Sequence, residues 1–173
     1  MELGVSPSAE TFALRAKIEA QAPTPHNLPQ PTATLVGRDQ QLARLMQTIP
    51  RQRLVTLHGV GGVGKSLLAL TAVHQLLNTV ASQHFPQGIW LVPLAGVEAD
   101  GNVHERLVAL LAATLNIDLG ETTDTLTQLV TALQGQRLLL LLDNLEHVVA
   151  EADILLQTLL QKTKIHWLLT SRV

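Results

Sequence analysis

Residues 59–66 read GVGGVGKS, so a lysine and a serine follow four glycines that lie within six positions. The stretch matches glycine, any four residues, glycine, lysine, and serine or threonine without a substitution. Glycine tolerates positive φ and carries no side chain, so successive backbone N–H groups can approach and surround a phosphate. This stretch constrains the fold most, because such a loop must join a strand to a helix.

The flanking residues supply that setting. RLVTLH (53–58) is a short apolar strand, and SLLALTAVHQLL (66–77) has a helical pattern. By chance alone the pattern would arise in roughly one chain of this length in a hundred. A glycine-rich turn that happens to precede a lysine is the alternative. We expect Lys65 to neutralise the β- and γ-phosphates and Ser66 to bind Mg²⁺. The residues predicted to bind the nucleotide's phosphates are Gly59, Val60, Gly61, Gly62, Val63, Gly64, Lys65, Ser66 and Leu67.

Helical and strand patterns alternate along the rest of the chain. Apolar residues at helical spacing predict helices near 42–49, 104–115, 124–134 and 148–159, and apolar runs predict strands at 88–95, 137–143 and 165–172. The run at 137–143 is uninterrupted, as expected of a strand covered on both faces. Such alternation predicts a parallel sheet with right-handed crossovers in a three-layer α/β domain.

The two ends of the chain differ in character. Residues 7–20 suggest a short helix within an N-terminal tail (1–22), and four prolines make residues 23–34 an extended linker. The folded domain is expected to begin near Leu35 and to run to Val173. The chain stops there directly after a predicted strand, so we expect a domain that is incomplete at its C-terminal end.

Composition excludes several classes of protein. Hydrophobic residues make up 46% of the chain, which argues against general disorder, and the absence of cysteine excludes disulfides and thiolate metal sites. A net charge of −2 gives no basic field for nucleic acid. No apolar run approaches the length of a membrane span, and the N-terminus lacks a secretory pattern. We expect a cytoplasmic protein that contacts neither membrane nor nucleic acid.

A phosphate loop needs an acid that fixes the Mg²⁺ shell, and Asp143 ends the apolar run at 137–143. Its alternative role is an N-cap for the next helix. The following residue, Asn144, cannot act as a base. Glu146 could polarise water in its place, although a solvated acid in the first turn of a helix is the slightly favoured interpretation. Hydrolysis is therefore in question, whereas binding is not.

The last predicted strand ends in Thr170, Ser171 and Arg172. The carboxyl edge of an open α/β sheet faces the ligand crevice, so Arg172 could sense a γ-phosphate. A surface arginine is the alternative. The seven histidines show no paired metal spacing, and His147, beside the predicted catalytic turn, is the one worth testing.

With these pieces in place, the chain resembles the STAND-type signalling ATPases, related to the NB-ARC and AP-ATPase modules, in the branch found in large bacterial transcriptional regulators. The stretches that carry the resemblance are NLPQPTATLVGRDQQL (27–42), RLVTLHGVGGVGKS (53–66), FPQGIWLVPLA (85–95), RLLLLLDNLEH (137–147) and WLLTSR (167–172). The N-terminal ELGVSPSAET resembles the end of a bacterial activation domain. Asn144 is usual in this branch, whereas Asp39 stands where glutamate is usual.

The resemblance implies an adenine-nucleotide switch that binds ATP or ADP with Mg²⁺. Val36 and Arg38 would pack on the adenine and ribose side. Related proteins rest with ADP, exchange it for ATP and then self-associate, and they need further domains of the same regulator to close the site. The implied strand order is 5-1-4-3-2, with the fifth strand missing here and the first strand left as an edge.

Three other functions remain open. A small-molecule P-loop kinase would need an arginine-rich lid, which is not visible in the sequence, and a GTP-binding protein would need an N-K-x-D signature. A non-catalytic fragment that serves as an interaction surface is the third. The leading prediction is a module that binds ADP and ATP and hydrolyses slowly or not at all.

Overall fold

Four parallel strands form the sheet at the centre of the molecule. The computed structural model describes residues 8, 10, 23–94, 102–120 and 124–172. The strands lie in the order β1-β4-β3-β2, and each neighbouring pair is parallel. Their bounds are β1 (Leu54–His58), β2 (Ile89–Pro93), β3 (Leu139–Asp143) and β4 (His166–Ser171).

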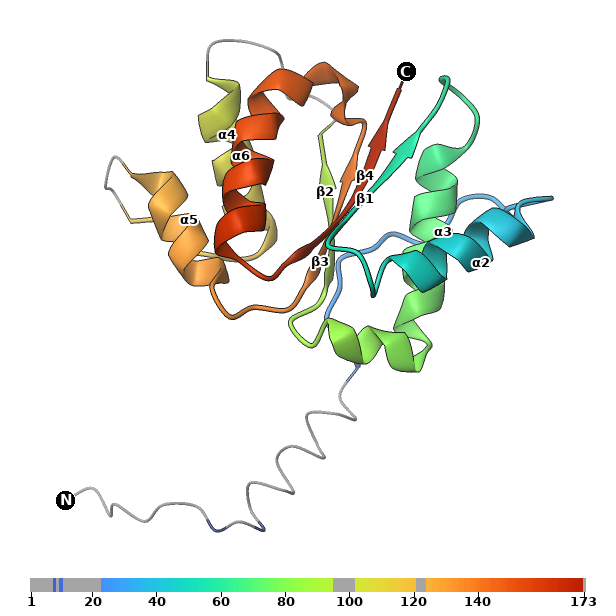
Figure 1. Ribbon diagram of the computed structural model, residues 1–173, viewed down its shortest axis with the longest axis horizontal. Helices are drawn as coiled ribbons and strands as arrows, with labels where there is room; N and C mark the ends of the chain where they lie inside the picture. Colours follow the sequence, from blue (N-terminus) through green and yellow to red (C-terminus); the bar gives the residue numbers. More distant parts are fainter. Residues whose placement is uncertain (1–7, 9, 11–22, 95–101, 121–123, 173) are drawn as a thin grey trace.

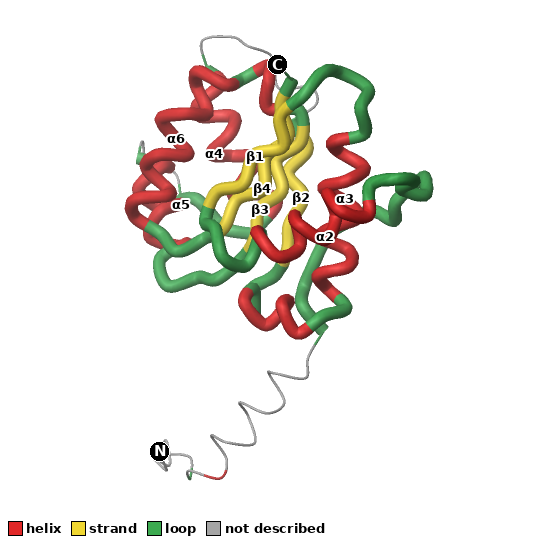
Figure 2. Tube along the Cα trace, turned by 45° about the vertical axis from the view of Figure 1, so that its right-hand side comes forward, coloured by secondary structure: helices red, strands yellow, loops and turns green. Residues whose placement is uncertain are grey.

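Helices cover both faces of this sheet (Figure 1). One face carries α2 (Asp39–Thr48) and α3 (Lys65–Leu77); the other carries α4 (Val103–Thr114), α5 (Thr125–Leu133) and α6 (Val149–Lys162). Short 3₁₀ helices, η1 (Val80–His84) and η2 (Leu145–His147), follow α3 and β3. Figure 2 shows the sheet between the two helical layers. The predicted three-layer α/β fold is confirmed.

The apolar run of β3 explains why two layers can form. Leu139 and Leu141 belong to the core on the α2 and α3 side. Leu140 and Leu142 belong to the core on the α4, α5 and α6 side. Successive side chains of a strand point to opposite faces, so an all-leucine strand stabilises both cores at once.

The strand register places all carboxyl ends at one edge of the sheet. His58 at the end of β1 pairs with Ser171, and Asp143 at the end of β3 pairs with Pro93. The loop after β1, the turn after β3 and the end of β4 therefore gather at this edge, which is where an open α/β sheet binds its ligands.

The proline-rich segment at 23–34, which the sequence predicts to be an extended linker, packs against the sheet. His26 forms a parallel bridge with Ile89 of β2, and the Asn27 side chain bonds both backbone groups of Leu91. Leu28 is only 7% exposed and belongs to the core. The packed part of the chain thus begins before Leu35, although the domain boundaries stay a prediction.

Element bounds differ from the predicted ones by a few residues. The first described helix begins at Asp39 rather than near residue 42, and α6 continues to Lys162. Apart from residues 8 and 10, the predicted helix at 7–20 lies outside the described residues. The order of the four strands matches the implied 1-4-3-2 part, with β1 at an edge of the described sheet. Within the described ranges, no helix is both long and apolar enough to cross a bilayer.

Candidate functional site

The glycine-rich loop runs from the end of β1 to the first residue of α3. Gly62 and Gly64 have φ of 76° and 80°, a left-handed conformation that glycine adopts without strain. A Cβ added at either residue would meet no atom within 4 Å. These glycines are therefore required by the backbone conformation rather than by a lack of space.

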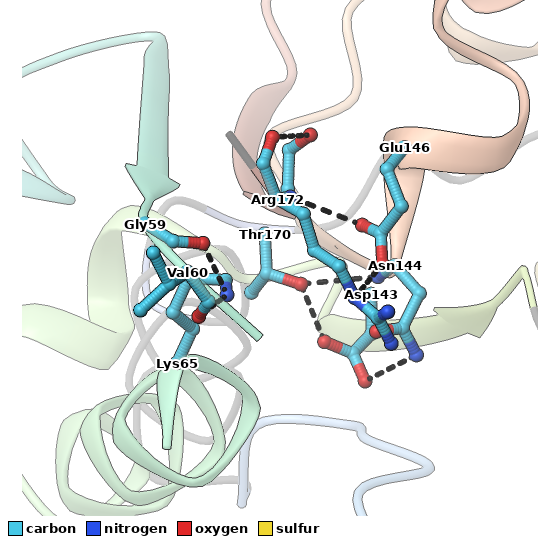
Figure 3. Close-up of polar contacts among 9 residues, drawn as sticks. Gly59, Val60, Lys65, Asp143, Asn144, Glu146, Thr170 and Arg172 are labelled. Carbon is cyan, nitrogen blue, oxygen red and sulfur yellow. Dashed lines mark hydrogen bonds and ion pairs between the residues drawn. The ribbon is translucent and has the colours of Figure 1, made fainter. Parts of the chain in front are cut away.

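Lys65, the first residue of α3, folds back over this loop (Figure 3). Its Nζ donates to the carbonyl oxygens of Gly59 and Val60, at 2.8 and 2.9 Å. An ammonium group has three donors, so these two bonds hold the charge at the loop and leave capacity for an anion. The side chain is half-buried.

Asp143 is held by the residue beside it and by β4 (Figure 3). The Thr170 hydroxyl donates to Asp143 Oδ1 at 2.5 Å, and the Asn144 side-chain amide donates to Oδ2 at 3.3 Å. The same Thr170 oxygen accepts the Asn144 backbone N–H at 3.0 Å. Asn144 has φ 64°, a left-handed conformation that asparagine tolerates better than most residues.

This turn bears on the alternative role of Asp143. The residues in the N-cap positions of η2 and α6 are Asn144 and Val148. The N-cap interpretation of Asp143 is therefore wrong for both described helices that follow it. Its carboxylate instead lies at the carboxyl edge of the sheet, where hydrogen bonds from Thr170 and Asn144 orient it.

Glu146 and Arg172 form an ion pair next to this turn (Figure 3). Arg172 Nε lies 2.8 Å from Glu146 Oε1, and the Arg172 backbone N–H donates to Oε2 at 3.2 Å. The Glu146 side chain is only 14% exposed, whereas that of Arg172 is 57% exposed. The favoured interpretation of Glu146 as a solvated helix acid is therefore wrong, because the turn directs it toward β4.

The loop, the turn after β3 and the end of β4 surround one cleft of about 490 Å³. It is lined by predicted site residues, by Asn144, which the sequence marked as unable to act as a base, and by five residues that the sequence did not single out. The predicted ones are Gly61, Gly62, Gly64, Lys65, Ser66, Leu67, Asp143 and Arg172. Those missed are Pro29, Thr32, Leu70, Leu91 and Leu141. The prolines of segment 23–34 could have signalled a wall of the cleft, but they equally indicate a linker.

Val36 and Arg38 lie apart from this cleft. Val36 is 82% exposed, and Arg38 lines a second hollow of about 470 Å³ beside β1. Lys65 and Val63 line that hollow too, so the lysine borders both spaces. The side chain of His147 is not among those the structure describes.

The oxygens near the cleft suit a magnesium ion bound together with phosphate. Ser66 and Asp143 line the same space, and hydroxyl and carboxylate oxygens are ligands that Mg²⁺ accepts. In the described residues, no cluster of three or more histidine or acidic side chains could hold a metal ion alone. Mg²⁺ commonly takes one or two carboxylates plus substrate phosphates, so this donor set fits it.

Comparison with known proteins identifies the family. The NB-ARC domain model matches residues 38–173. The chain belongs to the NB-ARC family. The match includes the glycine-rich loop, the strand that ends in Asp143 and the strand that ends near Arg172, so the predicted resemblance is confirmed.

Relatives of this NB-ARC chain include much longer proteins. Regulatory protein AfsR of Streptomyces griseus is 29% identical over 168 residues, covering 83% of this chain and 17% of AfsR. An uncharacterized protein of Mycobacterium tuberculosis, Rv0894, is 29% identical over 136 residues, covering 79% of this chain and 32% of its own length. The chain therefore spans about a sixth to a third of these relatives.

A solved structure supports the fold. The Aeropyrum pernix ORC2 protein, determined as ADPNP-ADP complexes, superposes with a TM-score of 0.60 at 13% identity. The superposition covers 84% of this chain and 43% of ORC2. This likeness agrees with a P-loop NTPase fold in the NB-ARC chain.

Proposed function

We propose that this chain is the adenine-nucleotide-binding module of a longer regulator, and that it acts as a switch with slow or absent hydrolysis. The observation that carries the proposal is the single cleft shared by Lys65, Ser66, Asp143 and Arg172. A lysine at a glycine-rich loop, a hydroxyl, an acid and an arginine are the side chains that a nucleoside triphosphate with Mg²⁺ requires.

Each residue takes a role that its chemistry allows. Backbone N–H groups of the loop and of the start of α3 bind the phosphates, and Lys65 neutralises their charge. Ser66 and Asp143 would hold Mg²⁺, which would offset the negative charge of the phosphates. Arg172 contacts a γ-phosphate. The ORC2 structure is described with ADPNP and ADP, which supports an adenine nucleotide for this chain as well.

Weak hydrolysis follows from the residues beside Asp143. A water molecule that attacks the γ-phosphate needs a base or an oriented acceptor. Asn144 is an amide, and its side chain already donates to Asp143. Both carboxylate oxygens of Glu146 lie within 3.2 Å of Arg172 nitrogens. Neither Asn144 nor Glu146 of the described turn is therefore well placed to act as a catalytic base.

The switch role rests on the relatives. AfsR is named a regulatory protein, and the chain matches 17% of it, so further domains of the same regulator are expected partners. Val36 and Arg38 would contact adenine and ribose, with Arg38 already lining the hollow that Lys65 borders. ATP would favour self-association, in the cytoplasm and without direct contact of this segment with nucleic acid or membrane.

Calorimetry with ADP, ATP and GTP in the presence of Mg²⁺ tests this proposal, together with phosphate release measured on the same preparation. We expect ADP and ATP to bind, GTP to bind far more weakly, and phosphate release to be slow or undetectable. Equal affinity for GTP would contradict the adenine specificity. Absence of binding by all three nucleotides would contradict the proposal as a whole.

A further inference from the structure

We propose that Glu146 is a positioning residue that aims Arg172 at the γ-phosphate and thereby lets the chain distinguish ATP from ADP. This inference rests on the proposed function, since it needs a nucleotide in the cleft. It assigns to Glu146 a role other than that of a catalytic base, and it names the pair of side chains that reads the third phosphate.

The contacts of Arg172 show how it is aimed. Glu146 binds Arg172 at two points, Nε through Oε1 and the backbone N–H through Oε2. A guanidinium has five N–H donors in a fixed plane, and four of them belong to the two terminal nitrogens. Binding through Nε therefore fixes the plane and leaves the terminal nitrogens as the edge that can bind phosphate oxygens.

The position of this arginine relative to the loop agrees with that role. A Cβ added at Gly61 would lie 3.8 Å from Arg172 Cδ, Nε and Cζ, so the side chain passes directly over the glycine-rich loop. Both Gly61 and Arg172 line the cleft, whereas Glu146 does not. Glu146 consequently acts on the ligand through Arg172 rather than by contact.

The turn that carries Glu146 is firmly anchored. Leu145 and Val148, on either side of it, are buried in the core on the α4, α5 and α6 side. Arg172, by contrast, is 57% exposed. Ordering a long exposed side chain costs conformational entropy, and a fixed carboxylate that orders Arg172 beforehand reduces this cost on binding.

A matched set of variants of the 173-residue chain tests the inference. Calorimetry with Mg²⁺ would compare ADP and a non-hydrolysable ATP analogue for the wild type, Glu146→Ala, Glu146→Gln, Arg172→Ala and the double alanine variant. Glu105→Ala, an exposed acid in the first turn of α4, serves as the control. Glu146→Gln retains one acceptor oxygen without the charge. It keeps the inference testable if the alanine variant fails to fold.

We expect Glu146→Ala to weaken the analogue about tenfold while ADP affinity changes by less than about twofold, because the lost contact serves only the γ-phosphate. Arg172→Ala should act alike, and the double variant should be no weaker than the worse single one, as for residues that act as a unit. Glu146→Gln should give a smaller loss.

Two outcomes would overturn the inference. Equal weakening of ADP and the analogue would show a purely structural role, and unchanged analogue affinity in Glu146→Ala would show that Glu146 does not position Arg172 for the γ-phosphate. In both cases the wild type would still bind nucleotide, so the proposed function would stand. A wild type that binds neither nucleotide would remove both.

Discussion

The hydroxyl of Thr170 on β4 donates to Oδ1 of Asp143 on β3 at 2.5 Å, which joins two neighbouring strands at the carboxyl edge of the sheet. The same oxygen accepts the backbone N–H of Asn144. Thr170 is 1% exposed, so these bonds are shielded from water. One buried hydroxyl therefore fixes both the acid and the turn that follows it.

Replacing this hydroxyl should impair folding and Mg²⁺-dependent binding together. Thr170→Val leaves the Asn144 N–H without its acceptor, and an unsatisfied buried group costs about 1–3 kcal/mol. Urea unfolding should show that loss, and calorimetry should show a smaller gain in nucleotide affinity on adding Mg²⁺. Thr170→Ser keeps the hydroxyl and is the control. Equal stability of the valine and serine variants would contradict this account of Thr170.

The backbone at Gly64 gives a second prediction. A residue with a Cβ would adopt its φ of 80° at a cost of about 1–2 kcal/mol. An added Cβ would meet no atom within 4 Å, so this cost does not arise from a steric clash with neighbouring residues. Gly64→Ala should lower the free energy of unfolding by that amount and weaken nucleotide binding. Gly120→Ala is the control, since a Cβ there meets only Gln128 Oε1 at 3.7 Å. Equal effects of the two substitutions would contradict a conformational cause.

Asn27 fastens the N-terminal segment to the edge strand β2. Its Nδ2 donates to Leu91 O at 2.9 Å, and its Oδ1 accepts from Leu91 N at 2.7 Å. Asn27→Ala should cost about 1–2 kcal/mol, and exchange of the Leu91 amide hydrogen should become faster. Asn27→Asp retains an acceptor for the Leu91 N–H, so hydrogen exchange at Leu91 should be slower in this variant than in Asn27→Ala. Unchanged exchange in the alanine variant would show that the segment does not depend on this side chain.

His166 makes stability depend on pH. Burial lowers its pKa, and the nearby charges of Arg53 and His84 act in the same direction, against a backbone hydrogen bond to Ile49 that raises it. The folded state therefore binds a proton less readily than the unfolded chain, whose histidine titrates near 6.5. The stabilisation that neutral His166 contributes is therefore fully present above that pH. It is lost as the pH falls through the lower pKa of the folded state.

Thermal unfolding between pH 7.5 and pH 5 measures this effect. His166→Asn keeps a donor for the Ile49 carbonyl but cannot titrate, so its melting temperature should fall less on acidification than that of the wild type. A variant whose melting temperature falls as steeply as the wild type would assign the pH dependence to other groups.

Much of the fold could be predicted because local patterns and global packing agree. The all-leucine run before Asp143 predicted a strand covered on both faces, and each face of β3 does join a different core. The loop predicted a strand on one side and a helix on the other, and β1 and α3 occupy those places. Periodicity and turn chemistry are local signals that a single sequence contains.

The remaining features depend on contacts between distant residues. Nothing in the sequence near Glu146 shows that its partner is Arg172, 26 positions away. The segment around Asn27 looked like a linker because prolines favour extended chain, whereas its packing depends on Leu91, 64 positions away. Site geometry of this kind is decided by strand order and register, which periodicity does not report.

Adenine nucleotide is proposed to bind in the cleft through Lys65, whose Nζ lies at the glycine-rich loop. Titration calorimetry of ADP with Mg²⁺ into wild type, Lys65→Ala and the exposed control Lys164→Ala tests it most directly. We predict binding by the wild type and by the Lys164 variant, and a loss of at least tenfold in the Lys65 variant. Equal binding by all three proteins would contradict the assignment of the site.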